Sequence, residues 1–260
     1  VGIAGCDKSL PGTMMAMARL NIPSVFVYGG TIKPGMLDGK ELTVVDVYEA
    51  VGAYDAGKLS LEDLKNIENV ACPNAGSCGG MFTANTMASI SEAIGLALPG
   101  SASPPAEDDR RNTMVYDSGV ACAKLLEMNI RPRDILTFEA FENAIMMLNS
   151  VGGSTNGILH LLALANEVNI DLTYDDFERI RKKTPHLADM KPGGNYVMES
   201  LDRIGGIPFV LKKLLEKGLL NENCMTVTGK TIKENLDAIK LPDTEQHVVR
   251  SIENPLHEVG

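Results

Sequence analysis

Three consecutive residues near the start of the chain, Cys6, Asp7 and Lys8, carry side chains that prefer different chemical partners. A cysteine thiolate is a soft ligand that suits zinc, copper or an iron–sulfur cluster, whereas a carboxylate suits magnesium or manganese. A lysine ammonium beside them would repel a cation. The same three residues also fit a plain structural interpretation, in which a small buried cysteine precedes an aspartate that caps a helix.

The flanking sequence places these residues on a turn between a strand and a helix. The apolar run Val1–Ala4 predicts a buried parallel strand that ends at Gly5. Pro11 suits the first turn of a helix that we expect to end near Leu20. In open α/β sheets, ligands bind outside the carboxyl ends of the strands, where this turn would lie. The positive end of the helix dipole would also favour ionisation of a thiol there.

A second loop, CPNAGSCGG at residues 72–80, repeats this arrangement before a helix predicted over 81–98. Cys78 stands between small residues at the N-terminus of that helix, and the glycines allow a bulky cofactor to approach the backbone. Cys72 lies on the same loop, so both thiols are candidates to face a cluster. A phosphate-binding glycine loop or an ordinary turn would give a similar pattern, so the loop alone does not decide.

The other candidates carry less information. Cys122 has apolar neighbours and is expected in the core, while Cys224 stays unassigned. His160 lies in an apolar run, where a hydrogen-bonded core histidine is the commoner case, and we assign it no role. The cysteines show neither a CxxC pair nor zinc-finger spacing, which argues against structural zinc. Residues 229–231, GKT, resemble the end of a P-loop, but a cysteine replaces its first glycine.

The composition is that of an ordinary globular protein of 260 residues, with a net charge of −10 that argues against a nucleic-acid surface. No apolar run is long enough to span a membrane. The five cysteines and the lack of a signal-peptide pattern favour a reducing compartment, which we expect to be the cytoplasm. Because the first residue is a valine inside a predicted strand, we expect a fragment whose targeting segment, if any, would be invisible.

Helical patterns and short apolar runs alternate along the chain, so we expect an α/β fold with a parallel-type sheet flanked by helices. A second strand is expected at residues 24–28, a loop at 31–39, a third strand ending at 70–71 and another strand at 225–228. Capping patterns predict helices beginning after Thr43, Ser60, Thr137 and Thr173. Further helices are expected at about 106–128, 158–164, 196–203 and 209–217.

Five segments together resemble the dihydroxy-acid dehydratase family: GCDKSLPG, NIPSVFVYGGTIKPG, CPNAGSCGGMFTANTM, VGGSTNGILHLLALA and DMKPGGNYV. This family shares a superfamily with phosphogluconate dehydratase and the sugar-acid dehydratases. The resemblance runs in order from Val1 to about Leu236, and several long independent motifs make it specific.

The resemblance implies a hydro-lyase that converts 2,3-dihydroxy-3-methyl carboxylic acids to 2-oxo acids in valine and isoleucine biosynthesis. Family members hold an iron–sulfur cluster with three cysteines and leave one iron open as a Lewis acid for the departing C3 hydroxyl. A nearby Mg²⁺ binds the substrate carboxylate and C2 oxygen. Three-cysteine ligation does not fix cluster type, but we favour 2Fe–2S over 4Fe–4S because the carbamylated-lysine architecture accompanies it in the family. The family is usually homodimeric.

By the same resemblance, Cys6 matches the second cluster ligand and Cys78 the third. Asp7 matches a magnesium ligand, and Lys8 matches a lysine that binds magnesium through a carbamate, which would turn a repelling ammonium into an anionic ligand. The first cluster cysteine and another magnesium aspartate lie upstream of Val1. A glutamate ligand and the serine base lie in a C-terminal β-rich domain that is absent here, so we expect no catalytic base in this chain.

We therefore expect residues 1–223 to form the central part of the N-terminal iron–sulfur dehydratase domain. Residues 224–260 would end that domain and lead towards the missing C-terminal domain. The fragment alone should be inactive, and the activity would belong to its parent. The expected partners are a small dihydroxy acid and a second copy of the protein, with neither nucleic acid nor membrane.

Three alternatives remain at this stage. A sugar-acid or phosphogluconate dehydratase belongs to the same superfamily, although FVYGGTIKPG resembles the branched-chain enzyme more closely. A non-catalytic iron–sulfur protein would share the cluster but would have no use for Asp7, Lys8 or magnesium. A glycine-loop binding module with structural cysteines finds no nucleotide motif to support it.

Overall fold

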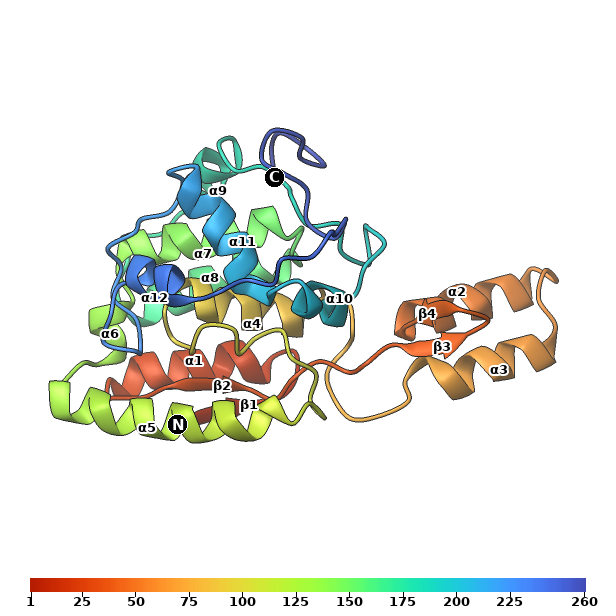
Figure 1. Cartoon of the computed structure of the whole chain (residues 1–260), viewed down its shortest axis with the longest axis horizontal. Helices are drawn as coiled ribbons and strands as arrows, with labels where there is room; N and C mark the ends of the chain where they lie inside the picture. Colours follow the sequence, from red (N-terminus) through yellow and green to blue (C-terminus); the bar gives the residue numbers. More distant parts are fainter.

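Helix α4 (Thr83–Ala93) runs through the middle of the computed structural model, which describes residues 1–260. Nearly all of its residues are buried, because its small side chains let neighbouring helices approach from several sides. It packs against α7 (Phe138–Ser150) and α8 (Asn156–Glu167), and these helices form the centre of the body (Figure 1). The prediction of a helix over 81–98 is too long at both ends, because α4 begins at Thr83 and ends at Ala93. Gly95, just beyond its end, has a φ of +89° that breaks the helix.

Two short parallel strands, β1 (Gly2–Ala4) and β2 (Phe26–Tyr28), are joined by α1 (Ser9–Leu20). Ala97 forms an isolated parallel bridge to Phe26, which leaves β1 at the edge. This agrees with the predicted α/β class and parallel pairing. The prediction that the strand at 1–4 is buried is wrong for one edge of β1. This edge has no partner strand, and Ile3 is 66% exposed.

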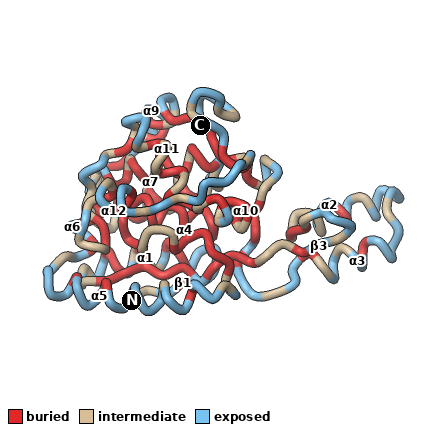
Figure 2. Tube along the Cα trace, viewed as in Figure 1, coloured by how far each residue is buried: buried red, intermediate tan, exposed pale blue.

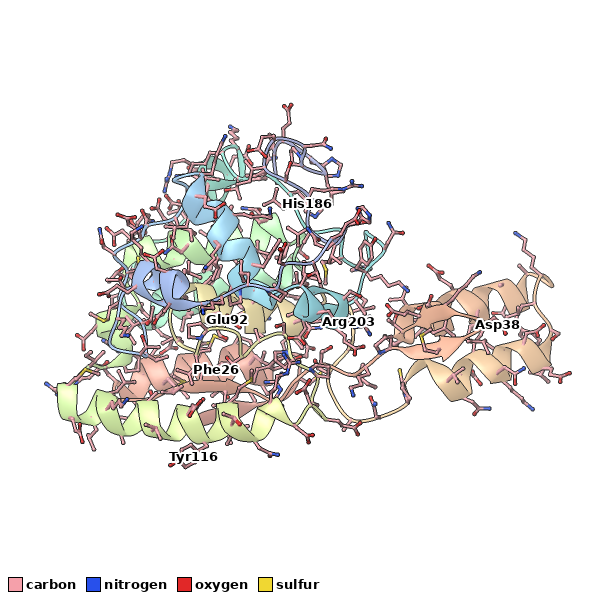
Figure 3. All side chains as sticks on the ribbon, in the orientation of Figure 1. Phe26, Asp38, Glu92, Tyr116, His186 and Arg203 are labelled. Carbon is pink, nitrogen blue, oxygen red and sulfur yellow. The ribbon has the colours of Figure 1, made fainter.

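A smaller unit, residues 35–71, projects from the body and is called the arm (Figure 1). It consists of the antiparallel hairpin β3 (Gly35–Leu37) and β4 (Lys40–Leu42), followed by α2 (Val44–Asp55) and α3 (Leu61–Ala71). Asp38 and Gly39 close the hairpin with positive φ angles, and Figure 3 places Asp38 on the arm. Figure 2 shows that much of the arm is exposed.

Two predictions fail in the arm. The predicted loop at 31–39 contains β3, and the strand expected to end at 70–71 is the last turn of α3. Leu64 and Ala71 are the buried residues of α3, and their spacing of seven residues puts them on one helical face. The short apolar pair at 70–71 therefore belongs to a helical pattern rather than to a strand.

Helix starts follow their local capping signals closely. Thr43 and Asp46 form a capping box at α2, and Thr173 and Asp176 form another at α9 (Tyr174–Arg181). The Thr137 hydroxyl accepts a backbone N–H at the start of α7. Each cap satisfies amide groups that have no partner within the helix, which is why these starts are predictable from the sequence.

The remaining helices surround the centre of the body. They are α5 (Arg110–Met128), α6 (Pro132–Ile135), α10 (Met198–Arg203), α11 (Gly206–Glu216) and α12 (Ile232–Ala238). The strand expected at 225–228 is wrong: Met225 makes one isolated bridge to Thr231, in a turn that leads into α12. None of the helices combines the length and the apolarity needed to cross a membrane.

Candidate functional site

A cavity of about 360 Å³ lies between the arm and the body, with Cys6, Asp7 and Cys78 on its wall. Val44, Val45 and Tyr48 of α2 belong to the arm side. The body side is completed by residues at the start of α4: Phe82, Thr83 and Ala84. The structure thus brings three of the four predicted site residues to one cavity, although Cys6 and Cys78 are far apart in the sequence. Lys8 lies beside it, next to Asp7.

The turn between β1 and α1 presents Cys6 to the outside. The Cys6 amide donates to the Ser9 hydroxyl at 3.2 Å, and Asp7 takes a left-handed conformation with φ of +36°. Cys6 is exposed, and the N-cap of α1 is Lys8, with no side-chain hydrogen bond to the helix. The plain interpretation of a buried cysteine followed by a capping aspartate is therefore wrong at this turn.

The loop that carries Cys78 is anchored against the residues that follow β2. The Ser77 amide donates to the Gly30 carbonyl at 3.0 Å, and the Ile32 amide donates to the Ser77 carbonyl at 2.7 Å. Gly76 has a φ of +137°, and a Cβ there would lie 2.4 Å from the Ile32 nitrogen. Only glycine fits this close approach of two backbones, as the glycine-rich sequence of the loop indicated.

The Cys78 thiol is affected by its surroundings. Partial burial raises the pKa of Cys78 above its usual value, and negative charge at Cys6 and Cys72 raises it further. Burial and this repulsion therefore disfavour the thiolate form of Cys78. Thiolates that repel one another are stabilised by a bound cation, so this pairing of Cys6 and Cys78 suits a metal or cluster.

Lys8 is held by two side chains of α8. Its Nζ donates to the Asn156 Oδ1 at 3.2 Å and lies 3.1 Å from the His160 Nε2, with Asp7 Oδ1 at 3.7 Å. An ammonium group can only donate, so His160 must accept through an unprotonated Nε2. Burial, helped by the charge of Lys8, lowers the pKa of His160, which favours that neutral ring.

Sequence reasoning missed this role of His160. The available signal was the spacing of Asn156 and His160, four residues apart on one helical face within a motif of the resemblance. The apolar neighbours of His160 favoured a core position, yet its ring is only half-buried and faces Lys8.

The side chains at this cavity supply ligand atoms for two kinds of metal centre, but only part of the ligand set that each centre needs. Cys6 and Cys78 offer soft sulfur donors, and Asp7 offers a hard oxygen donor. Nowhere in the chain do three or more His, Cys, Asp or Glu side chains converge into a group that could hold a metal ion. A cluster or Mg²⁺ at this cavity would therefore need further ligands besides these residues.

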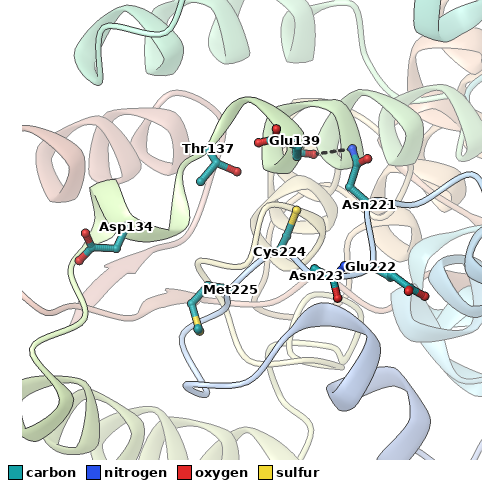
Figure 4. Close-up of a pocket in the computed structure, with 8 residues that line it drawn as sticks. All are labelled: Asp134, Thr137, Glu139, Asn221, Glu222, Asn223, Cys224 and Met225. Atoms are coloured by element: carbon teal, nitrogen blue, oxygen red, sulfur yellow. Dashed lines mark hydrogen bonds between the residues drawn. The ribbon is translucent and has the colours of Figure 1, made fainter.

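A larger cavity of about 440 Å³ lies elsewhere on the body (Figure 4). Its wall is lined by eight residues, of which three are acidic and one is a cysteine: Asp134, Thr137, Glu139, Asn221, Glu222, Asn223, Cys224 and Met225. Burial raises the pKa of the Cys224 thiol to about 11, and Glu139 contributes to the shift. This thiol stays protonated at neutral pH and has no second cysteine on the same wall, so it lacks the paired sulfur donors of the first cavity.

Comparison with known proteins decides the family. The family model described as Dihydroxy-acid/6-phosphogluconate dehydratase N-terminal matches residues 1–235. The chain belongs to this dehydratase family. The match spans both cysteine loops and the arm, so the resemblance seen in the sequence is confirmed, as is the N-terminal dehydratase domain.

Curated relatives carry the name dihydroxy-acid dehydratase. The relative from Sulfurisphaera tokodaii is 57% identical over the whole chain, which covers 47% of its length. The relative from Sulfolobus acidocaldarius is 55% identical and is covered to 46%, and that from Metallosphaera sedula is 55% identical and covered to 47%. The chain thus spans about half the length of the curated relatives it matches.

Proposed function

We propose that this chain is the N-terminal catalytic portion of a dihydroxy-acid dehydratase. The complete enzyme would convert 2,3-dihydroxy-3-methyl carboxylic acids to 2-oxo acids on the route to valine and isoleucine. The observation that carries the proposal is the meeting of two exposed thiols, Cys6 and Cys78, with the carboxylate of Asp7 on one cavity. An electron-transfer protein would need the thiols but not the adjacent carboxylate and lysine.

The donor set indicates which residues would hold each cofactor. Cys6 and Cys78 would bind an iron–sulfur cluster, for which we favour 2Fe–2S, and Asp7 and a carbamylated Lys8 would bind Mg²⁺. When bound, the two centres would supply Lewis acids for the departing hydroxyl and for the substrate carboxylate. Asn156 and His160 would hold the Lys8 nitrogen at the edge of the cavity.

The wall of the cavity supports a branched aliphatic substrate. Val44, Val45, Tyr48 and Phe82 supply apolar surface, and no lysine or arginine lines the cavity. A phosphorylated sugar acid would need cationic groups for its phosphate. This favours the branched-chain acids over 6-phosphogluconate, which remains the second candidate because the matched family includes both activities.

The other components of the proposal come from the family resemblance. The serine base and the remaining ligands would reside in the part of the relatives that this chain does not cover. We expect the complete enzyme to act as a homodimer in the cytoplasm, a compartment that keeps thiols such as Cys6 and Cys78 reduced.

The test uses the full-length protein, purified without air and assayed with Mg²⁺. We expect 2-oxo acid from 2,3-dihydroxy-3-methylbutanoate and little from 6-phosphogluconate. Cys78→Ala should abolish both turnover and cluster absorbance, whereas Cys224→Ala, which removes a thiol from the other cavity, should retain them. Turnover of the sugar acid alone would replace the proposed substrate class. A stable cluster with turnover of neither acid would favour an electron-transfer protein.

A further inference from the structure

We propose that Asn85, supported by Tyr28, is the positioning residue that directs the Cys78 thiol toward the cavity shared with Cys6. The inference rests on the proposed function, because it concerns Cys78 as a ligand. It adds a residue of α4 that lies outside the cavity wall and whose side-chain amide is engaged within the protein.

Asn85 grips the backbone on both sides of Gly79. Its Nδ2 donates to the Cys78 carbonyl at 2.7 Å and to the Gly80 carbonyl at 2.6 Å. The side chain is completely buried in α4, so it cannot exchange these partners for water. Because both carbonyls are drawn inward to one amide group, the backbone between them is fixed, and the Cys78 side chain is left on the exposed side of the loop.

Tyr28 fixes the orientation of the Asn85 amide. Its hydroxyl donates to the Asn85 Oδ1 at 2.7 Å and also contacts the Ser77 hydroxyl. With Oδ1 engaged by this donor, Nδ2 must face the two loop carbonyls. Tyr28 is buried in β2, and burial raises the pKa of its hydroxyl, so the group remains a neutral donor.

Arg111 in turn holds Tyr28 in place. Its guanidinium lies 5.5 Å from the centre of the Tyr28 ring and donates to the Tyr28 carbonyl at 3.0 Å. Its other hydrogen bonds also go to backbone carbonyls, those of Ser101, Pro104 and Pro105. A buried cation therefore stabilises the end of β2, from which the Tyr28 hydroxyl reaches toward the cysteine loop.

Several buried side chains in this network restrict the position of Cys78. Thr31, which is fully buried, is a second side chain that donates to the Cys78 carbonyl, at 3.2 Å. Buried polar networks are stabilising only when every member is satisfied, so each group restricts its neighbours to one arrangement. The consequence at the surface is a single orientation for Cys78, which is what a rigid cluster requires of its ligand.

The chain contains a matched control in Asn143. This residue of α7 is also completely buried, and its amide likewise grips one loop residue, Asn221, accepting at 2.8 Å and donating at 3.1 Å. That loop forms part of the other cavity (Figure 4). Asn85→Asp and Asn143→Asp both replace a buried amide donor with a carboxylate facing a carbonyl, but only the first acts on the loop that carries Cys78.

The experiment compares both variants in the full-length protein. We expect Asn85→Asp to release iron to a ferrous chelator about 10- to 100-fold faster than the wild type and to change the cluster absorbance spectrum. In the cluster-free protein, the rate at which iodoacetamide alkylates Cys78 should also differ from that of the wild type. This rate is measured from the mass of the peptide that contains Cys78. Asn143→Asp should match the wild type in all three measurements. Equal behaviour of the two variants would overturn the proposal.

Tyr28→Phe keeps the test decisive if Asn85→Asp does not fold. This variant removes a single hydroxyl and should accelerate iron release by roughly 3- to 10-fold, because Asn85 loses the donor that orients it. Wild-type iron release and alkylation in Tyr28→Phe would overturn the proposal. A wild-type protein that takes up no cluster at all would instead contradict the proposed function, so the two failures are distinguishable.

Discussion

The Nζ of Lys8 lies 3.1 Å from the Nε2 of His160, which joins the first turn of the chain to the middle of α8. Asn156, one helical turn earlier, accepts a second hydrogen bond from the same nitrogen. Two acceptors on one helical face thus fix a lysine that would otherwise move freely in solvent. The arrangement holds the nitrogen beside Asp7, where the proposed function requires an oxygen ligand for magnesium.

We predict that His160→Phe lowers the carbamate content of Lys8 by about tenfold, because the variant keeps an aromatic ring but loses the acceptor for the single N–H that a carbamylated lysine retains. The measurement is the ¹³C signal of the carbamate after equilibration of the full-length protein with ¹³C-labelled bicarbonate. His186→Phe, which alters a partly buried histidine on another segment, should leave the signal unchanged. A full carbamate signal in His160→Phe would show that the contact has no such role.

The Lys8 contacts also show which parts of the site could be predicted from the sequence and which could not. Local signals were sufficient for the helix starts that carry a capping residue, because a cap such as Thr43 with Asp46 is complete within four residues. The meeting of Cys6 with Cys78 was expected from the family resemblance, because the strand predicted before the second loop is in fact the last turn of α3. The partner of Lys8 lies about 150 residues away on a helix that looked like core, and no local pattern encodes that distance.

The arm illustrates a second limit. Its hairpin is made of two three-residue strands, too short for alternation to be distinguished from a loop. Its position over the cavity depends on contacts with the body, which local patterns do not reveal. The apolar residues Val44 and Tyr48 were predictable as helix residues, but their place opposite the cysteines was not.

We predict that Lys191 sets the position of the arm. Its Nζ lies 3.1 Å from Asp46 Oδ2 and donates to the Glu41 carbonyl at 3.3 Å, and both charged side chains are mostly buried. Lys191→Met should speed hydrogen exchange of the arm amides roughly fivefold, corresponding to about 1 kcal/mol of lost local stability. In the full-length enzyme, the KM for the substrate should rise more than kcat falls.

The matched control for Lys191 is Arg203→Met. Arg203 also pairs with the arm, at 3.6 Å from Glu41, but its side chain is 60% exposed. Figure 3 shows Arg203 on the side of the body from which the arm projects. Exposed ion pairs contribute little, so this variant should exchange at nearly the wild-type rate. Equal exchange in both variants would contradict a special role for Lys191.

Glu92 gives a prediction for pH dependence. This carboxyl group lies inside the body (Figure 3) and accepts the amides of Gly100 and Ala102, yet burial raises its pKa to about 7. Between its unfolded value of 4.5 and about 7, the folded chain binds more protons than the unfolded chain. Its contribution to stability is therefore fully present below pH 4.5 and is lost as the pH rises to about 7.

We expect the free energy of unfolding of the wild type, relative to Glu92→Gln, to fall by about 3 kcal/mol between pH 4.5 and pH 8. Urea unfolding of both proteins across this range measures the difference, and groups common to both cancel. The free energy of unfolding of the wild type, relative to that of the variant, should rise as the pH is lowered. Parallel pH profiles would mean that Glu92 does not titrate in this window.

Gly76 tests the backbone requirement of the cysteine loop. Gly76→Ala combines a φ of +137° with a Cβ that would lie 2.4 Å from the Ile32 nitrogen, whereas Gly57→Ala places a φ of +68°, close to the left-handed helical region, in open space. The Gly57 variant should lose about 1 kcal/mol of stability. The Gly76 variant should lose about 2–4 kcal/mol, because the two backbones must separate.

That separation would move the loop on which Cys78 stands, so Gly76→Ala should also weaken iron retention in the full-length protein while Gly57→Ala retains iron normally. Urea unfolding and iron release to a chelator, measured on the same samples, separate the two effects. If both variants lost the same stability and kept their iron, the close approach between Gly76 and Ile32 would not constrain the loop. A loss of iron confined to the Gly76 variant would tie the glycine of this turn directly to the geometry of Cys78.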